Sequence, residues 1–183
     1  MQSRFIKLAF LELDSDEPFM NRLTAWVSKN KVFHVELGFE NNEYFSIMYK
    51  CPLSLRPKTL DNPHYNIHTL QITPLQYTLL YNTCTNLTKR DIQFDSAGLW
   101  YVYLYKLCCC FSEGETNLDD VKHTFCSKII TQVLQHIGLP QVMHLHPEST
   151  SPSDLLEAIK HSHNNVIDAA RINRPYFKLT PNF

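Results

Sequence analysis

Residues 124–138 read Thr124-Phe125-Cys126-Ser127-Lys128-Ile129-Ile130-Thr131-Gln132-Val133-Leu134-Gln135-His136-Ile137-Gly138. Apolar side chains recur in this stretch at helical spacing, which predicts a helix with one face toward a core: Phe125, Ile129, Ile130, Val133, Leu134 and Ile137. Thr124 is the expected N-cap. Gly138, followed by Pro140, predicts a left-handed helix end.

Cys126 therefore falls in the first turn of the expected helix. There the unpaired backbone N–H groups and the positive end of the helix dipole favour a thiolate, which is the reactive form of cysteine. The simpler interpretation is one more apolar residue at a helix start, because free cysteine is among the most buried residue types. Taken alone, Cys126 fits both interpretations.

The composition indicates one domain over residues 1–183. An apolar content of 44%, with 12% aromatic residues, excludes a disordered chain. The apolar runs are too short to span a bilayer, so no integral membrane segment is expected. With 17 basic and 18 acidic residues, the formal net charge of -1 gives no electrostatic case for binding nucleic acid or an anionic membrane.

The cysteines indicate a reducing compartment, such as the cytoplasm. Three of the six are contiguous, Cys108-Cys109-Cys110, and the others follow no disulfide framework. Adjacent cysteines cannot all bind one ion, so we expect the triplet to pack at the end of an aromatic segment. The H-x-H pairs at 144–146 and 161–163 lack zinc-site spacing to further ligands. We therefore expect no metal and no cofactor.

One predicted strand places a histidine beside a glutamate. Over residues 32–39, apolar side chains share one face while His34 and Glu36 share the other. Residues 40–43 predict a hairpin turn, because asparagine tolerates positive φ, and residues 44–49 predict the returning strand.

The remaining elements predict an α+β fold, with an antiparallel sheet packed against helices. Strands are expected over residues 5–13 and 65–72, and a proline-rich loop is expected over 51–66. A capping box at Thr73-Pro74-Leu75-Gln76 opens one helix, and Ser151-Pro152-Ser153-Asp154 caps another. Residues 96–111, dense in aromatic side chains, are expected to form a buried helix, with a strand as the alternative because many of these residues favour strands.

A thiol nucleophile needs a base to take its proton and a third group to orient that base. Cys126 and His34 are the pair that the sequence offers. A histidine on a strand is more often a satisfied polar residue than a catalyst, and that alternative stays open.

Four short motifs, in this order and spacing, resemble the circularly permuted branch of the NlpC superfamily of papain-like thiol hydrolases. They are the H-V-x-[IL] strand at Phe33-His34-Val35-Glu36-Leu37, the aromatic-Asp pair Phe94-Asp95, the helix start Phe125-Cys126-Ser127-Lys128-Ile129-Ile130, and the S-P-x-D-L helix start at Ser151-Pro152-Ser153-Asp154-Leu155. Together they span about residues 32–156. The motifs resemble most those of poxviral and other large-DNA-virus members of this branch. The resemblance therefore implies a viral protein that acts inside the infected host cell.

The resemblance implies a papain-like fold in which Cys126 is the nucleophile and His34 the base. It also implies a cysteine peptidase or amidase that cleaves an amide, isopeptide or ester bond in a peptide, ubiquitin-like or acyl-lipid substrate. The alternatives are a lipid acyl hydrolase or acyltransferase, and a noncatalytic binding protein that keeps the fold.

The third catalytic residue departs from the family pattern. The family often has a carboxylate on the strand after the histidine, but Tyr44-Phe45-Ser46-Ile47-Met48-Tyr49 contains none. We predict Glu36, which would lean two positions along its own strand, about 7 Å at Cα. Ser46 is the alternate, and it faces Glu36 only if the hairpin loop has three residues.

A rival frame, meaning a different choice of nucleophile and base, exists within the same superfamily. Asp95-Ser96-Ala97-Gly98-Leu99 resembles the D-C-S-G-L nucleophile motif of the unpermuted branch, with serine in place of cysteine. Its base would be His144 or His146, and the protein would be an inactive or altered enzyme. This frame leaves the helix start at Cys126 unexplained.

Overall fold

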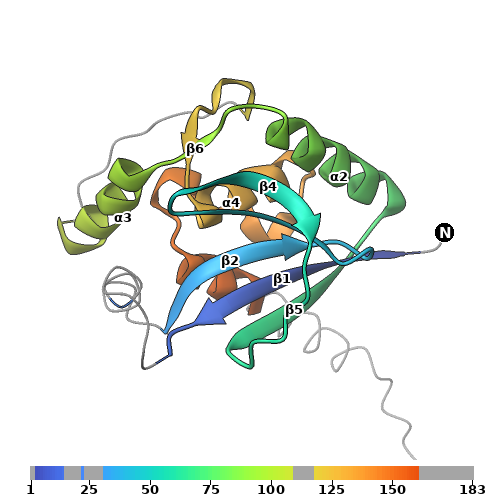
Figure 1. Cartoon of the computed structure of the whole chain (residues 1–183), viewed down its shortest axis with the longest axis horizontal. Coiled ribbons are helices and arrows are strands. Elements are labelled where there is room, and N and C mark those ends of the chain that lie inside the picture. Colours follow the sequence, from blue (N-terminus) through green and yellow to red (C-terminus); the bar gives the residue numbers. More distant parts are fainter. Residues whose placement is uncertain (1–2, 15–21, 23–30, 109–117, 161–183) are drawn as a thin grey trace, which may run out of the picture.

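The computed structural model describes residues 3–14, 22, 31–108 and 118–160, and Figure 1 shows their arrangement. The elements follow one another as β1 (Arg4–Glu12), β2 (Val32–Gly38), β3 (Glu43–Met48), β4 (Cys51–Pro57), β5 (Tyr65–Ile72), α2 (Pro74–Thr88), β6 (Gln93–Phe94), α3 (Ser96–Cys108), the 3₁₀ turn η1 (Leu118–Asp120), β7 (His123–Thr124), α4 (Cys126–His136), the 3₁₀ turns η2 (Pro140–Val142) and η3 (Pro147–Ser149), and a helix over residues 152–160. In the described part of the chain, no helix has the length and apolar character needed to cross a bilayer.

The expected α+β class is confirmed. Strands β1 to β5 form one antiparallel sheet in the order β4-β3-β2-β1-β5, and β6 and β7 form a short parallel pair. Helix α4 lies behind the sheet in Figure 1 and packs on β2, β3 and α2. The core lies between this helix and the sheet, where large side chains from both are fully buried: Phe10, Leu37, Phe45, Phe125 and Ile129.

The β2–β3 hairpin sets which side chains face each other. The backbone N–H of Phe39 donates to the carbonyl of Glu43 at 2.9 Å, which closes a loop of three residues. Asn42, the last of the three, has φ of 59°, the left-handed conformation expected of asparagine in such a turn. Leu37 lies opposite Phe45, where the pairing of the two strands ends, and the same register extended by one residue places Ser46 across from Glu36. Of the possible hairpin loop lengths, the structure has the three-residue loop, over residues 40–42.

Helix α4 begins at Cys126, and its N-cap is Phe125. The prediction of Thr124 as N-cap is wrong by one residue, because Thr124 belongs to β7, where it pairs with Phe94. Phe125 has no side chain that can cap, but its carbonyl accepts the first helical hydrogen bond from Ile129 at 3.1 Å. Cys126 is therefore the first residue of the helix.

The end of α4 is as expected, since Gly138 has φ of 68°. A Cβ added there would lie more than 4 Å from any atom beyond its two neighbours in the chain, so the only cost of a substitution is the strain of the left-handed backbone conformation. Gly138→Ala should lower the free energy of unfolding by about 1 kcal/mol, the usual cost of a left-handed alanine. Gly138→Asn should cost less, because asparagine tolerates this conformation. Urea unfolding of both variants measures the difference, and equal losses would contradict a conformational origin.

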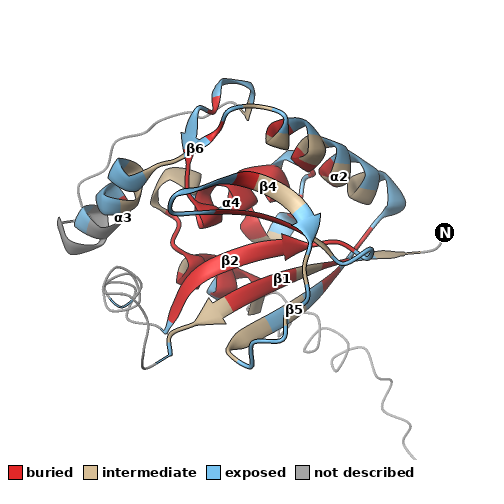
Figure 2. Cartoon of the chain, viewed as in Figure 1, coloured by how far each residue is buried: buried red, intermediate tan, exposed pale blue. Residues whose placement is uncertain are grey.

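The first part of α4 is buried all round (Figure 2), although only one stripe of it is apolar. Two polar residues in its first turn have partners outside the helix. Ser127 donates its hydroxyl to the carbonyl of Thr150 at 2.7 Å, and Lys128 Nζ lies 2.7 Å from Glu148 Oε2. These contacts hold the start of α4, and with it Cys126, to η3 and the residue after it.

Two expectations are corrected. The expected loop over residues 51–66 contains strand β4, and its prolines Pro52 and Pro57 are tolerated because β4 is the outermost strand of the sheet. The aromatic segment forms a helix, α3, over Ser96–Cys108, but several of its described side chains are exposed rather than buried. Trp100 is 44% exposed and Leu104 57% exposed, although Val102 is fully buried.

Candidate active site

Two adjacent polar side chains of β2 are almost completely buried, His34 at 5% exposure and Glu36 at 1%. Both point to the same face because they are two positions apart on a strand. His34 Nε2 lies 3.3 Å from Glu36 Oε1. Nε2 makes no hydrogen bond of good geometry in the described part of the chain, so its contact with Glu36 is an ion pair only when the ring is protonated. Glu36 thus leans along its own strand toward the ring.

The Cys126 thiol meets His34 at an open edge of β2. Strand β3 pairs with β2 only at Leu37 and Gly38, which leaves the edge at Val35 to the start of α4. The sulfur of Cys126 bonds the His34 side chain and accepts hydrogen bonds from the backbone N–H groups of Val35 and Ser127. Since Nε2 of His34 faces Glu36, we assign the other ring nitrogen, Nδ1, to the thiol.

The electrostatics favour an ionised pair. Burial by itself lowers the pKa of His34, but the charge and hydrogen bond of Cys126 and the carboxylate of Glu36 outweigh burial and raise that pKa to about 9. Burial by itself raises the pKa of Cys126, yet His34 and the two backbone N–H groups hold it below its ordinary value of 9.0. Both pKa shifts act in the direction of a thiolate beside an imidazolium.

Glu36 is the anionic centre of a four-membered cluster. Its Oε1 accepts hydrogen bonds from Lys58 Nζ at 2.6 Å and from the Tyr65 hydroxyl at 3.1 Å, in addition to facing His34. Lys58 Nζ also donates to the Tyr65 hydroxyl at 2.8 Å. Burial tends to raise the pKa of Glu36, but His34 first and Lys58 second lower it to about 2.

Sequence reasoning missed Lys58 and Tyr65. Lys58 follows β4, within the segment expected to be a loop, and its charge alone does not reveal a buried partner. Tyr65 begins a strand that was predicted correctly, but its neighbours depend on the register: Leu11 of β1 lies opposite both His34 and Tyr65. Only the pairing of three strands brings the tyrosine to the histidine face.

Two further cysteines in the described part of the chain provide internal comparisons. Cys84, fully buried in α2, has a pKa raised well above 9.0 by burial alone. Cys51, the first residue of β4, is an exposed free thiol. Burial alone therefore raises the pKa of a cysteine here, and the lowered pKa of Cys126 results from its partners. The side chains of Cys108-Cys109-Cys110 lie outside the described residues.

The rival frame places its residues differently. Asp95 caps α3 by accepting a hydrogen bond from the N–H of Gly98 at 2.7 Å, and Ser96 is the exposed first residue of that helix. His144 and His146 are both exposed, as expected of surface residues. Across the described ranges, no cluster of three or more histidine, cysteine or acidic side chains could hold a metal ion.

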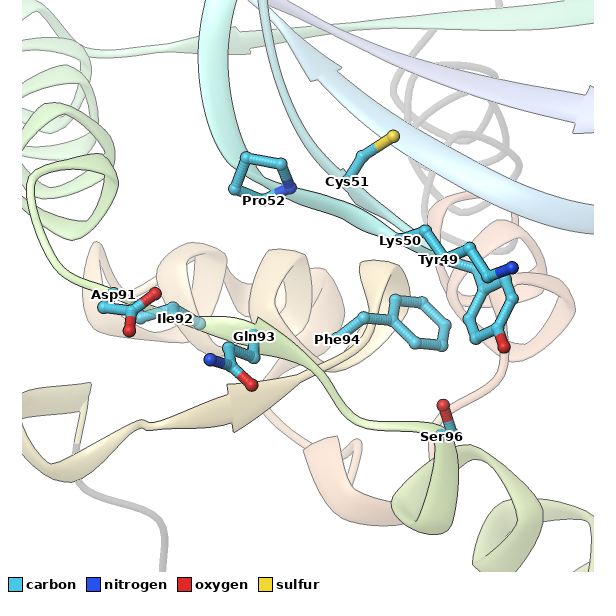
Figure 3. A pocket seen from close by; sticks show the side chains of 9 residues that line it. All are labelled: Tyr49, Lys50, Cys51, Pro52, Asp91, Ile92, Gln93, Phe94 and Ser96. Atoms are coloured by element: carbon cyan, nitrogen blue, oxygen red, sulfur yellow. The ribbon is translucent and has the colours of Figure 1, made fainter.

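A pocket of about 320 Å³ opens between the β3–β4 turn and the segment leading through β6, and Figure 3 shows its lining. Tyr49 and Phe94 meet across it edge to face, with ring centroids 5.8 Å apart. Phe94 pairs with Thr124, two residues before Cys126, so one wall of the pocket continues into the β6–β7 pair that precedes α4. Cys126 and His34 themselves are not part of the lining.

Comparison of the chain with protein-family models, with curated proteins and with solved structures found no match.

Proposed function

We propose that this chain is a thiol hydrolase of the papain-like, circularly permuted NlpC type, with Cys126 as nucleophile, His34 as base and Glu36 as the group that orients His34. One observation carries the proposal: Cys126 begins a buried helix with its sulfur against His34, and His34 Nε2 lies 3.3 Å from a carboxylate oxygen of Glu36. The same order of groups activates thiol nucleophiles in general.

The reaction is acyl transfer in two steps. The Cys126 thiolate attacks the carbonyl carbon of an amide or ester and forms a tetrahedral intermediate. The backbone N–H groups at the start of α4, including that of Cys126, stabilise the oxyanion. His34 then gives its proton to the leaving group as the carbon–nitrogen or carbon–oxygen bond breaks. Water, deprotonated by His34, hydrolyses the resulting thioester and restores the thiol pair.

The substrate that we propose is a peptide, a ubiquitin-like conjugate or an acyl lipid, since all three present a carbonyl to a thiolate. A lipid acyl hydrolase or acyltransferase would use the same residues, because only the leaving group or the acceptor differs.

A noncatalytic binding protein is the alternative, and the burial of the pair favours it. Cys126 is 6% exposed and His34 5% exposed, so a substrate carbonyl has little access to the sulfur in this conformation. In a binding protein, the cysteine and histidine would serve only to satisfy each other inside the fold.

The rate of Cys126 alkylation against pH tests the proposal. The native protein and His34→Ala are treated with iodoacetamide, and mass spectrometry follows each cysteine peptide. Because only the thiolate reacts, Cys126 should label well below pH 8 in the native protein and at least about tenfold more slowly in His34→Ala. Cys84 and Cys51 in the same molecules report on a buried thiol without partners and on an exposed thiol.

A pH dependence of Cys126 labelling that is the same in both proteins, with Cys51 labelling normally, would refute a thiolate–imidazolium pair. The binding protein would then be the better description.

A further inference from the structure

Glu36 presents one oxygen atom to two cations. His34 Nε2 lies 3.3 Å from Oε1, and Lys58 Nζ lies 2.6 Å from the same atom. The two cations are therefore no more than about 6 Å apart. The shorter contact belongs to Lys58, which also has the better hydrogen-bond geometry. The same carboxylate oxygen is consequently shared between the two cations.

We propose that Lys58 is a positioning residue of this site, which neutralises Glu36 so that the carboxylate orients His34 without holding its proton too tightly. The inference rests on the proposed function, because it concerns how His34 works as acid and base. Tyr65 completes the arrangement, since its hydroxyl bonds both Lys58 and Glu36 and thereby holds the lysine against the carboxylate.

The charges around the pair are accounted for element by element. Cys126 of α4 and Glu36 of β2 are the anions that face His34. Lys58, after β4, is the second cation on Glu36, while Tyr65 of β5 and Tyr44 of β3 are neutral phenols within its field. The residues of β1 opposite this cluster, Ala9 and Leu11, carry no charge. The Cys126 thiolate and the Glu36 carboxylate are therefore balanced by the His34 imidazolium and the Lys58 ammonium group.

The partial neutralisation of Glu36 by Lys58 matters for catalysis because His34 must release its proton to the leaving group. A buried carboxylate with no other partner would hold the imidazolium strongly, and a base whose pKa lies far above the working pH is a poor acid. Lys58 weakens that hold. The Lys58 side chain is 34% exposed, so its ammonium group keeps part of its hydration while it compensates the charge of the buried Glu36 carboxylate.

The test is a titration of His34 in the full-length chain carrying Cys126→Ala, in which the thiol no longer couples to the imidazole. Nitrogen-15 spectra of labelled histidine follow the ring, with His34→Ala identifying its signals. Adding Lys58→Met removes the cation, and the pKa of His34 should rise by about one unit. Lys58→Arg, which keeps the charge, should return the pKa to its starting value. The exposed Lys89→Met serves as the matched control and should change nothing.

An unchanged or lower His34 pKa in a folded Lys58→Met protein would overturn the inference, as would a Lys58→Arg protein that behaves like Lys58→Met. Should Lys58→Met fail to fold, Tyr65→Phe decides: loss of one donor to Glu36 should raise the His34 pKa by a few tenths, and no change would refute the shared carboxylate. These outcomes do not depend on Cys126, so they are distinct from failure of the proposed reaction, which alkylation and turnover report.

Discussion

Replacing Cys126 by alanine should abolish hydrolysis, lowering turnover by a factor on the order of 10⁴ or more. The reason is that the sulfur forms the covalent thioester, and neither His34 nor the helix N–H groups can replace it. The loss of stability should be small, because the side chain lost is a single sulfur at the first position of α4. The measurement is release of product from a panel of peptide, ubiquitin-like and acyl-ester substrates, with unfolding midpoints recorded alongside.

Cys51→Ala is the matched control, since Cys51 is an exposed thiol outside the Cys126–His34 pair. It should retain turnover. If Cys126→Ala keeps measurable activity on a substrate that the native protein cleaves, Cys126 is not the nucleophile, and the exposed Ser96 of the rival frame becomes the next residue to replace.

The second large effect concerns acid stability and Glu36. Its pKa in the folded protein is about 2, against 4.5 for an ordinary glutamate, because His34 and Lys58 stabilise the carboxylate. A lowered folded-state pKa adds stability above about pH 4.5, and that stability is lost as the pH falls toward 2. The contribution is about 3 kcal/mol from a shift of this size.

Urea unfolding between pH 2 and 7 measures this contribution. The native protein should exceed Glu36→Gln in free energy of unfolding at pH 6, and the excess should shrink by about 3 kcal/mol at pH 2. Glu157→Gln, at a half-exposed carboxylate, reports what an amide replacement alone does. An excess that stays constant with pH would show that Glu36 is not held ionised by the cluster.

The alkaline side offers no such test, because two contributions oppose each other. The raised pKa of His34 adds stability below pH 6.5 that is lost as the pH rises to about 9. The lowered pKa of Cys126 adds stability as the pH rises toward 9.0. A thiolate–imidazolium pair carries the same number of protons as a thiol beside a neutral imidazole, so the net slope between these values is small.

Local patterns were sufficient for most of the scaffold. Helix α4 and strand β2 were predictable because one side of each carries apolar residues at the period of its own geometry. The hairpin was predictable because Asn42 tolerates positive φ. The errors arose where tertiary position overrides local preference. Pro52 is acceptable in β4 only because that strand is at an edge, and Trp100 and Tyr101 of α3 are exposed although the aromatic composition of this segment suggested a core.

The sequence by itself determined that Cys126 would lie in the first turn of a helix and that His34 and Glu36 would share a strand face, since both follow from periods of a few residues. Only the tertiary structure decided that the thiol meets the imidazole at the open edge of β2, and that Lys58 and Tyr65 meet on Glu36. The physical reason is that strand register and helix packing bring together residues 22 to 92 positions apart, and no local pattern encodes such a distance.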